Sequence, residues 1–221
     1  MKQSQRRSQK QPTVTACFPT FIYRAPLAKS ASTGGAKLRR ELRREADILR
    51  DIDTEGLSWS EKNYPQGYTS YGSMDRLHKS SPTFSSLEQE LDRHVAAFAR
   101  KQKWDLRQGR LEMSSCWINV MPAGAAHSLH LHPLSVVSGT FYVQVPKGSS
   151  PIKFEDPRLE RFMAQPPRLS NAPPQLQPFI EMTPKDGDVI LFESWLRHEV
   201  PALRSGFESE RISVSFNYDW I

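Results

Sequence analysis

Seven short strand-like segments fill the chain from residue 111 to residue 220. They are LEMSSCWINVM (111–121), HSLHLH (127–132), VVSGTFYVQV (136–145), IKFE (152–155), PFIEM (178–182), DVILFES (188–194) and RISVSFNYDW (211–220). Glycine, proline and aspartate separate them, and one proline-rich excursion (156–176) interrupts the series. Regularly spaced strands with turn residues between them favour a β-sandwich or a double-stranded barrel.

The part before residue 111 indicates two helices. Apolar residues recur at helical spacing over 36–53, and a second helix is predicted to begin near Ser85, where Ser85 and Glu88 fit a capping box. The two apolar stripes are Leu38, Leu42, Ala46, Leu49 and Ile52 in the first helix, and Leu87, Leu91, Val95 and Phe98 in the second. The segment between them (58–82) shows no clear period and is expected to be a long loop, of the kind that often carries function.

The length of the chain and the distribution of its charged residues limit the possible domain organisation. The 221 residues suffice for one sizeable core, so we expect a disordered basic tail (1–12) and a single domain (13–221). Within it, 13–110 would form a helical and loop support, and 111–221 the β-core. The net charge is +6, and the tail residues Lys2, Arg6, Arg7 and Lys10 contribute +4, which leaves +2. With so little charge elsewhere, nucleic-acid binding is not expected.

The prediction of the cellular compartment depends on whether the sequence contains a membrane span, a secretory signal or a disulfide framework. No stretch is apolar enough for a membrane span, and no apolar segment follows the first charges as a secretory signal would require. Cys17 and Cys116 are too few for a disulfide framework or a cysteine metal site. The sequence therefore predicts a cytoplasmic protein without membrane attachment, and leaves a homo-oligomer open.

Three histidines between 127 and 132 are candidate metal ligands. In a strand, side chains alternate between faces, so His130 and His132 would share one face and could bind one ion. His127 would lie on the leucine side of the strand or in the preceding turn. His198 follows a strand and a bend, and is expected to face the pair from the opposite side of a barrel.

The last strand has one apolar and one polar face. Ile212, Val214, Phe216 and Tyr218 alternate with Arg211, Ser213, Ser215, Asn217 and Asp219. If the polar face looks into a barrel, the planar guanidinium of Arg211 could pair with a carboxylate, with a hydrogen bond from Ser213.

These motifs together resemble a family of oxygenases. The segments CWINVM, HSLHLHPLSVVSGTFYVQVP, KFEDPRL, GDVILFESWLRHEVP and ERISVSFNY, spread over about 57–218, are similar to a bacterial family within the Fe(II)/2-oxoglutarate-dependent oxygenases. The resemblance implies a mainly β fold with flanking α-helices, namely the double-stranded β-helix (a jelly roll, cupin-like). It implies Fe(II) as cofactor and 2-oxoglutarate as co-substrate, and hydroxylation of an unidentified small-molecule or protein substrate with release of succinate and CO2.

The resemblance also implies roles for particular residues. His130, His132 and His198 would hold the metal, and no other catalytic residue is expected. Arg211 and Ser213 would hold the far carboxylate of the keto acid. Asn119, Ser138, Thr140 and Tyr142 are candidate co-substrate or cavity contacts, and the loop NYPQGYTSYGS (63–73) is a candidate lid or substrate wall.

One position departs from the usual pattern of the superfamily. His132 stands where an aspartate or glutamate normally completes two histidines and a carboxylate. The iron could have three histidine ligands, or two histidines and water, or the site could hold another metal or none. Glu193, beside the distal histidine, is a reserve ligand. Two other functions also stay open: a cupin-type metal protein that works without 2-oxoglutarate, and a non-catalytic binding protein.

Overall fold

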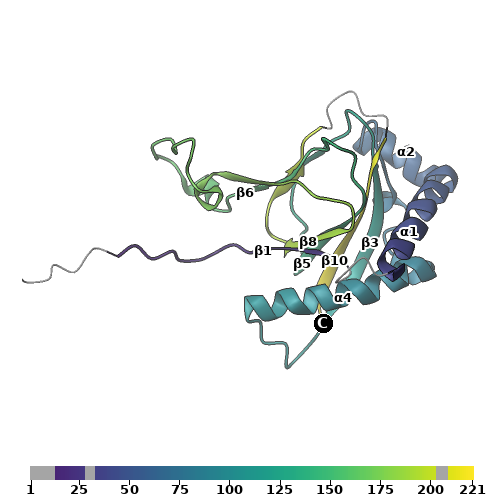
Figure 1. The fold of residues 1–221 in the computed structure, drawn as a ribbon, viewed down its shortest axis with the longest axis horizontal. Helices are drawn as coiled ribbons and strands as arrows, with labels where there is room; N and C mark the ends of the chain where they lie inside the picture. Colours follow the sequence, from purple (N-terminus) through teal and green to yellow (C-terminus); the bar gives the residue numbers. More distant parts are fainter. Residues whose placement is uncertain (1–12, 28–32, 203–208) are drawn as a thin grey trace, which may run out of the picture.

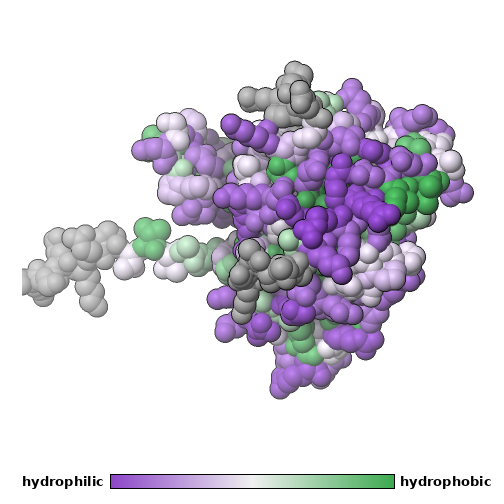
Figure 2. All heavy atoms as spheres, turned by 45° about the vertical axis from the view of Figure 1, so that its right-hand side comes forward, coloured by the Kyte–Doolittle hydropathy of each residue, from purple (hydrophilic) through white to green (hydrophobic). Residues whose placement is uncertain are grey.

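The computed structural model describes residues 13–27, 33–202 and 209–221. The predicted basic tail (1–12) lies outside the described residues. Residues 13–21 run as extended chain away from the body of the molecule before the first strand begins (Figure 1). Figure 2 shows a face on which hydrophilic residues predominate and apolar residues gather only in small areas. Among the described helices, none combines the length and the hydrophobicity needed to span a bilayer.

Two antiparallel sheets form the centre of the fold (Figure 1). The large sheet has the order β1-β8-β5-β10-β3-β2, and the small sheet has the order β4-β9-β6-β7. The strands are β1 (Ile22–Pro26), β2 (Tyr68–Thr69), β3 (Leu111–Met121), β4 (His127–His130), β5 (Val137–Gln144), β6 (Ile152–Glu155), β7 (Phe179–Met182), β8 (Asp188–Glu193), β9 (His198–Val200) and β10 (Arg211–Trp220). Seven of them coincide with the predicted segments to within two residues at each end.

The helices come from the part of the chain before β3. They are α1 (Thr33–Ile52), α2 (Thr54–Asn63), α3 (Leu77–Ser80) and α4 (Pro82–Gln102), with short 3-10 turns at η1 (Ser70–Gly72), η2 (Leu159–Arg161) and η3 (Pro174–Leu176). The last two turns lie in the excursion between β6 and β7, which projects from the body in Figure 1.

Two apolar layers hold these elements together. The first lies between the large sheet and the helices: Leu42 of α1 and Leu91 of α4 pack there with Val214 and Phe216 of β10. The second lies between the two sheets, where Phe192 of β8 meets residues of β6 and β9. Burial of this apolar area is the main stabilising term. A mainly β jelly roll with flanking helices, as the sequence predicted, is confirmed.

The helix boundaries correct part of the prediction. α4 begins at Pro82, because Ser81 caps it: the Ser81 hydroxyl accepts hydrogen bonds from the backbone amides of Thr83 and Phe84. The capping box predicted at Ser85 is therefore wrong, and the helix starts about one turn earlier. The predicted stripe Leu87, Leu91, Val95 and Phe98 is buried as expected. In α1 the stripe is correct except at its end, where Ile52 is 65% exposed.

The segment expected as a long loop contains ordered elements. Residues 58–82 include most of α2, the short strand β2 and α3. The residues that α2 buries are Gly56 and Ser60, so it has no apolar stripe that could signal a helix in the sequence. Its start is marked instead by Asp53, whose carboxylate accepts a hydrogen bond from the Gly56 amide.

Asp53 also fixes the segment that follows α2. Its side chain accepts hydrogen bonds from the hydroxyls of Tyr68 at 2.8 Å and Ser73 at 2.5 Å, and it is 6% exposed. A side chain at position 56 would collide with this carboxylate, so glycine is required there. One buried carboxylate thus joins the start of α2 to both ends of the turn 68–73.

We expect Asp53→Ala to lower the free energy of unfolding by about 2–4 kcal/mol, because it removes a helix cap, leaves the buried Tyr68 hydroxyl without its acceptor and removes one of the two acceptors of the Ser73 hydroxyl. Asp53→Asn keeps one oxygen acceptor and the shape of the side chain, and should lose less. Urea unfolding followed by circular dichroism measures both values. Equal losses in the two variants would contradict the role assigned to these hydrogen bonds.

Candidate active site

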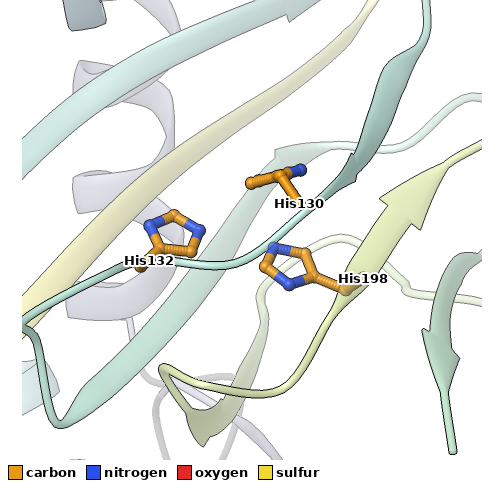
Figure 3. Close-up of side chains that lie close together, drawn as sticks. All are labelled: His130, His132 and His198. Carbon is orange, nitrogen blue, oxygen red and sulfur yellow. The ribbon is translucent and has the colours of Figure 1, made fainter. Parts of the chain in front are cut away.

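Three histidines meet at one end of the small sheet (Figure 3). His130 is the last residue of β4 and His198 the first of β9, and the two are direct partners in the antiparallel ladder. His132 lies just beyond β4, where its backbone amide donates a hydrogen bond to the Ser194 carbonyl. The potential ligand atoms of the three side chains lie within 4.8 Å of one another.

Hydrogen bonds orient two of the rings. The Nδ1 atom of His130 lies 2.6 Å from the Ser128 carbonyl, and that of His198 lies 3.0 Å from the Leu196 carbonyl. A carbonyl only accepts, so each Nδ1 carries the proton and each Nε2 keeps a free lone pair. Burial lowers the pKa of His198 to about 3 and that of His132 to about 4, and positive charge on His130 acts in the same direction. Both rings are therefore neutral at pH 7, as metal binding requires.

The spacing suits a single ion. Imidazole nitrogens bind zinc at about 2.0–2.1 Å, so two nitrogens on one ion of that size lie at most about 4.2 Å apart. Side-chain rotations would have to close the remaining gap from 4.8 Å. All the members of this cluster are imidazoles, and no carboxylate belongs to it among the described residues. That all three bind the same ion stays a prediction.

The positions of these histidines were predicted from the alternation of side chains between the two faces of a strand. This alternation holds only in part. The ladder between β4 and β9 is irregular between His127 and His130, so the simple alternation of faces is broken there. His127 was expected on the leucine side or in the preceding turn. Instead it lines the same cavity as His130, and its ring stacks on Tyr64 at a centroid distance of 4.3 Å. His198 was expected opposite the pair, but it lies beside His130 on the neighbouring strand.

A cavity of about 400 Å3 extends from the histidines between the two sheets. The polar face of β10 forms one wall, with Arg211, Ser213, Ser215 and Asn217 lining the cavity. The alternate residues of the strand face the helices in the first apolar layer. The predicted two-faced character of β10, with its polar face turned inward, is confirmed.

Arg211 has the surroundings of a carboxylate-binding residue. It is 3% exposed, and Nη1 donates a hydrogen bond to the Ser150 carbonyl at 3.1 Å. Its Nε is buried without a hydrogen-bond partner, and it has no ion pair within the described part of the chain. A buried guanidinium in this state strongly favours a bound anion.

Two tyrosines near Arg211 also have hydroxyls without a hydrogen-bond partner in the described part of the chain. The guanidinium lies 5.0 Å from the centre of the Tyr142 ring, and the hydroxyls of Tyr142 and Tyr64 are buried without a partner. Burial raises the pKa of both tyrosines, and the charge of Arg211 acts in the opposite direction. Both hydroxyls are therefore protonated at neutral pH and available as donors. Tyr64, Arg211 and Ser213 line this end of the cavity, which fits a carboxylate, whereas Tyr142 lies behind the lining in the buried core.

The other candidate contacts differ in position. Asn119 and Thr140 line the cavity as expected, and the Asn119 Oδ1 atom is buried without a partner. Ser138 does not line the cavity: its hydroxyl bonds to the Ser194 hydroxyl at 2.8 Å and to Asn217 Oδ1 at 2.7 Å. Ser138 thus joins strands rather than contacting a ligand.

The position of Glu193 does not support its predicted role as a reserve metal ligand. Phe192 lines the cavity and packs against His198, with ring centroids 4.5 Å apart. Side chains alternate along a strand, so Glu193 follows on the other face of β8, and it is not among the cavity residues.

The sequence pointed to the tyrosines of the loop 63–73 but not to the two tryptophans of the site. Trp59 from α2, Tyr71 from η1 and Trp117 from β3 line the cavity beside the histidines. One signal was present: Trp117 lies two residues before Asn119 and therefore shares its face of the strand. The loop 63–73 supplies Tyr64, Thr69 and Tyr71, which agrees with its predicted place as a wall.

Comparison with known proteins gives one family match. Residues 115–217 match the model of the family described as "Putative 2OG-Fe(II) oxygenase". This range contains the three histidines, Arg211 and the polar face of β10. Among curated proteins, none matches the chain in sequence.

Several solved structures share the fold. HygX from Streptomyces hygroscopicus, with nickel and 2-oxoglutarate bound, aligns with a TM-score of 0.59 and 16% identity, over 90% of this chain and 83% of that chain. A prolyl-4-hydroxylase from Pseudomonas putida aligns with a TM-score of 0.54 and 15% identity, over 90% and 92%. SnoN, an α-ketoglutarate-dependent epimerase from nogalamycin biosynthesis, aligns with a TM-score of 0.60 and 13% identity, over 90% and 76%. At these identities the likeness establishes the fold.

Proposed function

We propose that the protein is an Fe(II)- and 2-oxoglutarate-dependent oxygenase that hydroxylates a second substrate and releases succinate and CO2. The observation that carries this proposal is the pairing of two sites in one cavity: a cluster of three histidines, and a buried arginine without an anionic partner among the described residues. The match of residues 115–217 to the oxygenase family supports it independently.

The chain would hold a metal and a keto acid in a fixed relation. His130, His132 and His198 would bind iron through nitrogen atoms, and the carbonyls of Ser128 and Leu196 keep two of these rings in place. Bound iron with 2-oxoglutarate would supply the oxidising chemistry. Arg211 and Ser213 would fix the far carboxylate, and so hold the keto group toward the histidines.

We propose that all three histidines are ligands. With neutral side chains, the bound ion keeps one more positive charge than it would beside a carboxylate. That charge strengthens its attraction for the dianionic keto acid and weakens its retention by the protein alone. Iron and 2-oxoglutarate should therefore bind cooperatively, each raising the affinity for the other by the same factor.

Isothermal titration under anaerobic conditions tests the proposal. We expect 2-oxoglutarate to bind the iron-loaded protein with one molecule per chain, and to bind far more weakly after the metal is chelated. Glutarate is the matched control, because it has both carboxylates but lacks the keto group that completes the chelate on the metal, so iron should raise its affinity far less than that of 2-oxoglutarate. Metal-independent binding of 2-oxoglutarate, or iron binding without any keto-acid binding, would contradict the proposal.

We also propose a cytoplasmic location and no nucleic-acid partner. Cys116 is buried and Cys17 is exposed, and they form no disulfide. The proposed reaction needs iron in its reduced state, which a reducing compartment favours. Most of the net charge lies in the first twelve residues, so the domain itself offers little attraction to a polyanion.

A further inference from the structure

A continuous run of aromatic rings leads from the surface to the histidines. The Trp59 and Tyr71 ring centroids are 6.2 Å apart, those of Tyr71 and Trp117 are 5.0 Å apart, and those of Trp117 and His132 are 5.9 Å apart. All four residues line the cavity. Tyr71 is 50% exposed and Trp117 is 6% exposed, so the run begins in solvent and ends beside the metal cluster.

Trp59, Tyr71 and Trp117 form an aromatic wall of the cavity. This wall lies away from the end of the cavity that is proposed to bind the keto acid. On the inner face of β10, Arg211 is followed by Ser213 and then Ser215, and Ser215 is the ladder partner of Trp117. Four residues of a strand span about 13 Å. The keto acid would occupy the end at Arg211, so the end at Trp117 is left for the second substrate.

Few charged side chains line the cavity beside the aromatic wall. Arg211 supplies the one cationic group of the cavity lining apart from its histidines, and no aspartate, glutamate or lysine lines the cavity among the described residues. Beside Trp117, the amide of Asn119 is 3% exposed, and its Oδ1 atom has no hydrogen-bond partner. The wall therefore combines apolar ring surface with a buried acceptor, Asn119 Oδ1, that has no partner among the described residues.

We infer that this end of the site binds an uncharged, flat ring that carries a hydrogen-bond donor. The inference rests on the proposed function and names its substrate class. A planar ring gains contact with Trp59, Tyr71 and Trp117, and its donor satisfies Asn119.

Two other ligand classes suit the wall less well. A quaternary ammonium needs rings that enclose it, but adjacent rings of the wall lie 5.0–6.2 Å apart and touch one another, with no space between them. A sugar brings several hydroxyls, each of which needs a partner on burial. Beside the rings, the described part of the lining offers them amides and hydroxyls but no carboxylate, and two of these groups, Asn119 Nδ2 and Ser215 Oγ, already bond to each other.

Binding of matched probes tests the inference. The probes are 2-naphthol, 2-naphthoate, 2-naphthylmethyl-trimethylammonium and methyl glucoside, each titrated anaerobically into protein loaded with Fe(II) and 2-oxoglutarate and followed by calorimetry. We expect 2-naphthol to bind most tightly, with the charged analogues about tenfold weaker or more. Tightest binding by any of the other three probes, or no saturable binding of 2-naphthol, overturns the inference.

Variants locate the binding site. Tyr71→Ala removes a half-exposed ring from the middle of the wall, and it should weaken 2-naphthol binding about tenfold, with a thermal melt to confirm that the variant is folded. Trp220→Leu is the matched control, because Trp220 is 43% exposed and does not line the cavity, and it should change the affinity less than about twofold. Equal affinities of Tyr71→Ala and wild type would overturn the assignment.

The same samples separate this inference from the proposed function. If 2-oxoglutarate binds with iron but no flat neutral ring does, the oxygenase proposal stands and the substrate class is wrong. If 2-naphthol binds and depends on Tyr71 but 2-oxoglutarate does not bind, the substrate class stands and the co-substrate assignment is wrong.

Discussion

Arg211→Ala is expected to weaken 2-oxoglutarate binding by at least about thirtyfold while iron binding is retained. A charge-assisted, two-point contact in a shielded site contributes on the order of 2–5 kcal/mol, and each 1.4 kcal/mol is a factor of about ten. The side chain is 3% exposed and has no anionic partner among the described residues, so a bound carboxylate would supply its missing interaction. Anaerobic titration of 2-oxoglutarate into the iron-loaded variant measures the loss.

Two controls make the result specific. Arg211→Lys keeps the positive charge but loses the planar fork, so it should fall between wild type and Arg211→Ala. Thermal melts of both variants report whether the fold survives loss of the hydrogen bond to the Ser150 carbonyl. An unchanged dissociation constant for 2-oxoglutarate in a folded Arg211→Ala protein would remove Arg211 from the co-substrate site.

The second large effect is expected at the histidines. His130→Ala and His198→Ala should each weaken iron binding by about 100-fold or more, because each removes a direct ligand, whereas loss of a mere supporting contact typically costs 10–100-fold. His127→Ala is the matched control: it removes an imidazole from the same cavity but outside the metal cluster. Iron affinity and stoichiometry under anaerobic conditions, with 2-oxoglutarate present, give the comparison. A silent His130→Ala together with a damaging His127→Ala would mean that the metal lies elsewhere.

Variants of His132 distinguish a metal centre with three histidine ligands from one with two histidines and water. If it is a ligand, His132→Ala should lose iron as His130→Ala does. If the centre has two histidines and water, iron should remain, held by His130, His198 and the keto acid. His132→Asp recreates the common pair of histidines with a carboxylate, and retention of iron in that variant would show that the carboxylate reaches the ion.

The sequence predicts the β-part of this fold well because apolar and polar residues alternate along strands such as β10, which is buried on both faces. In β10 the alternation of Ile212, Val214 and Phe216 with polar residues survives unbroken over the residues that line the cavity. A helix buried along one stripe, such as α4, is equally visible. α2 is not, because the residues that it buries are Gly56 and Ser60, and its start depends on the tertiary contacts of Asp53.

The site was predictable where one strand supplies neighbouring residues. Arg211 and Ser213 share a face, and that spacing alone places them together. The bulge in β4 could not be anticipated from alternation, so His127 appears in the cavity against expectation. The aromatic wall combines residues of α2, η1 and β3, and only the folded chain brings these three elements together.

The most direct test is a crystal structure of the protein soaked anaerobically with Fe(II) and 2-oxoglutarate, with diffraction recorded at the iron absorption edge. The account predicts one anomalous peak within about 2.3 Å of a ring nitrogen of each of His130, His132 and His198. It also predicts the keto acid beside that peak, with its far carboxylate on Arg211. An iron peak away from these histidines, or a keto acid whose carboxylate does not contact Arg211, would contradict it.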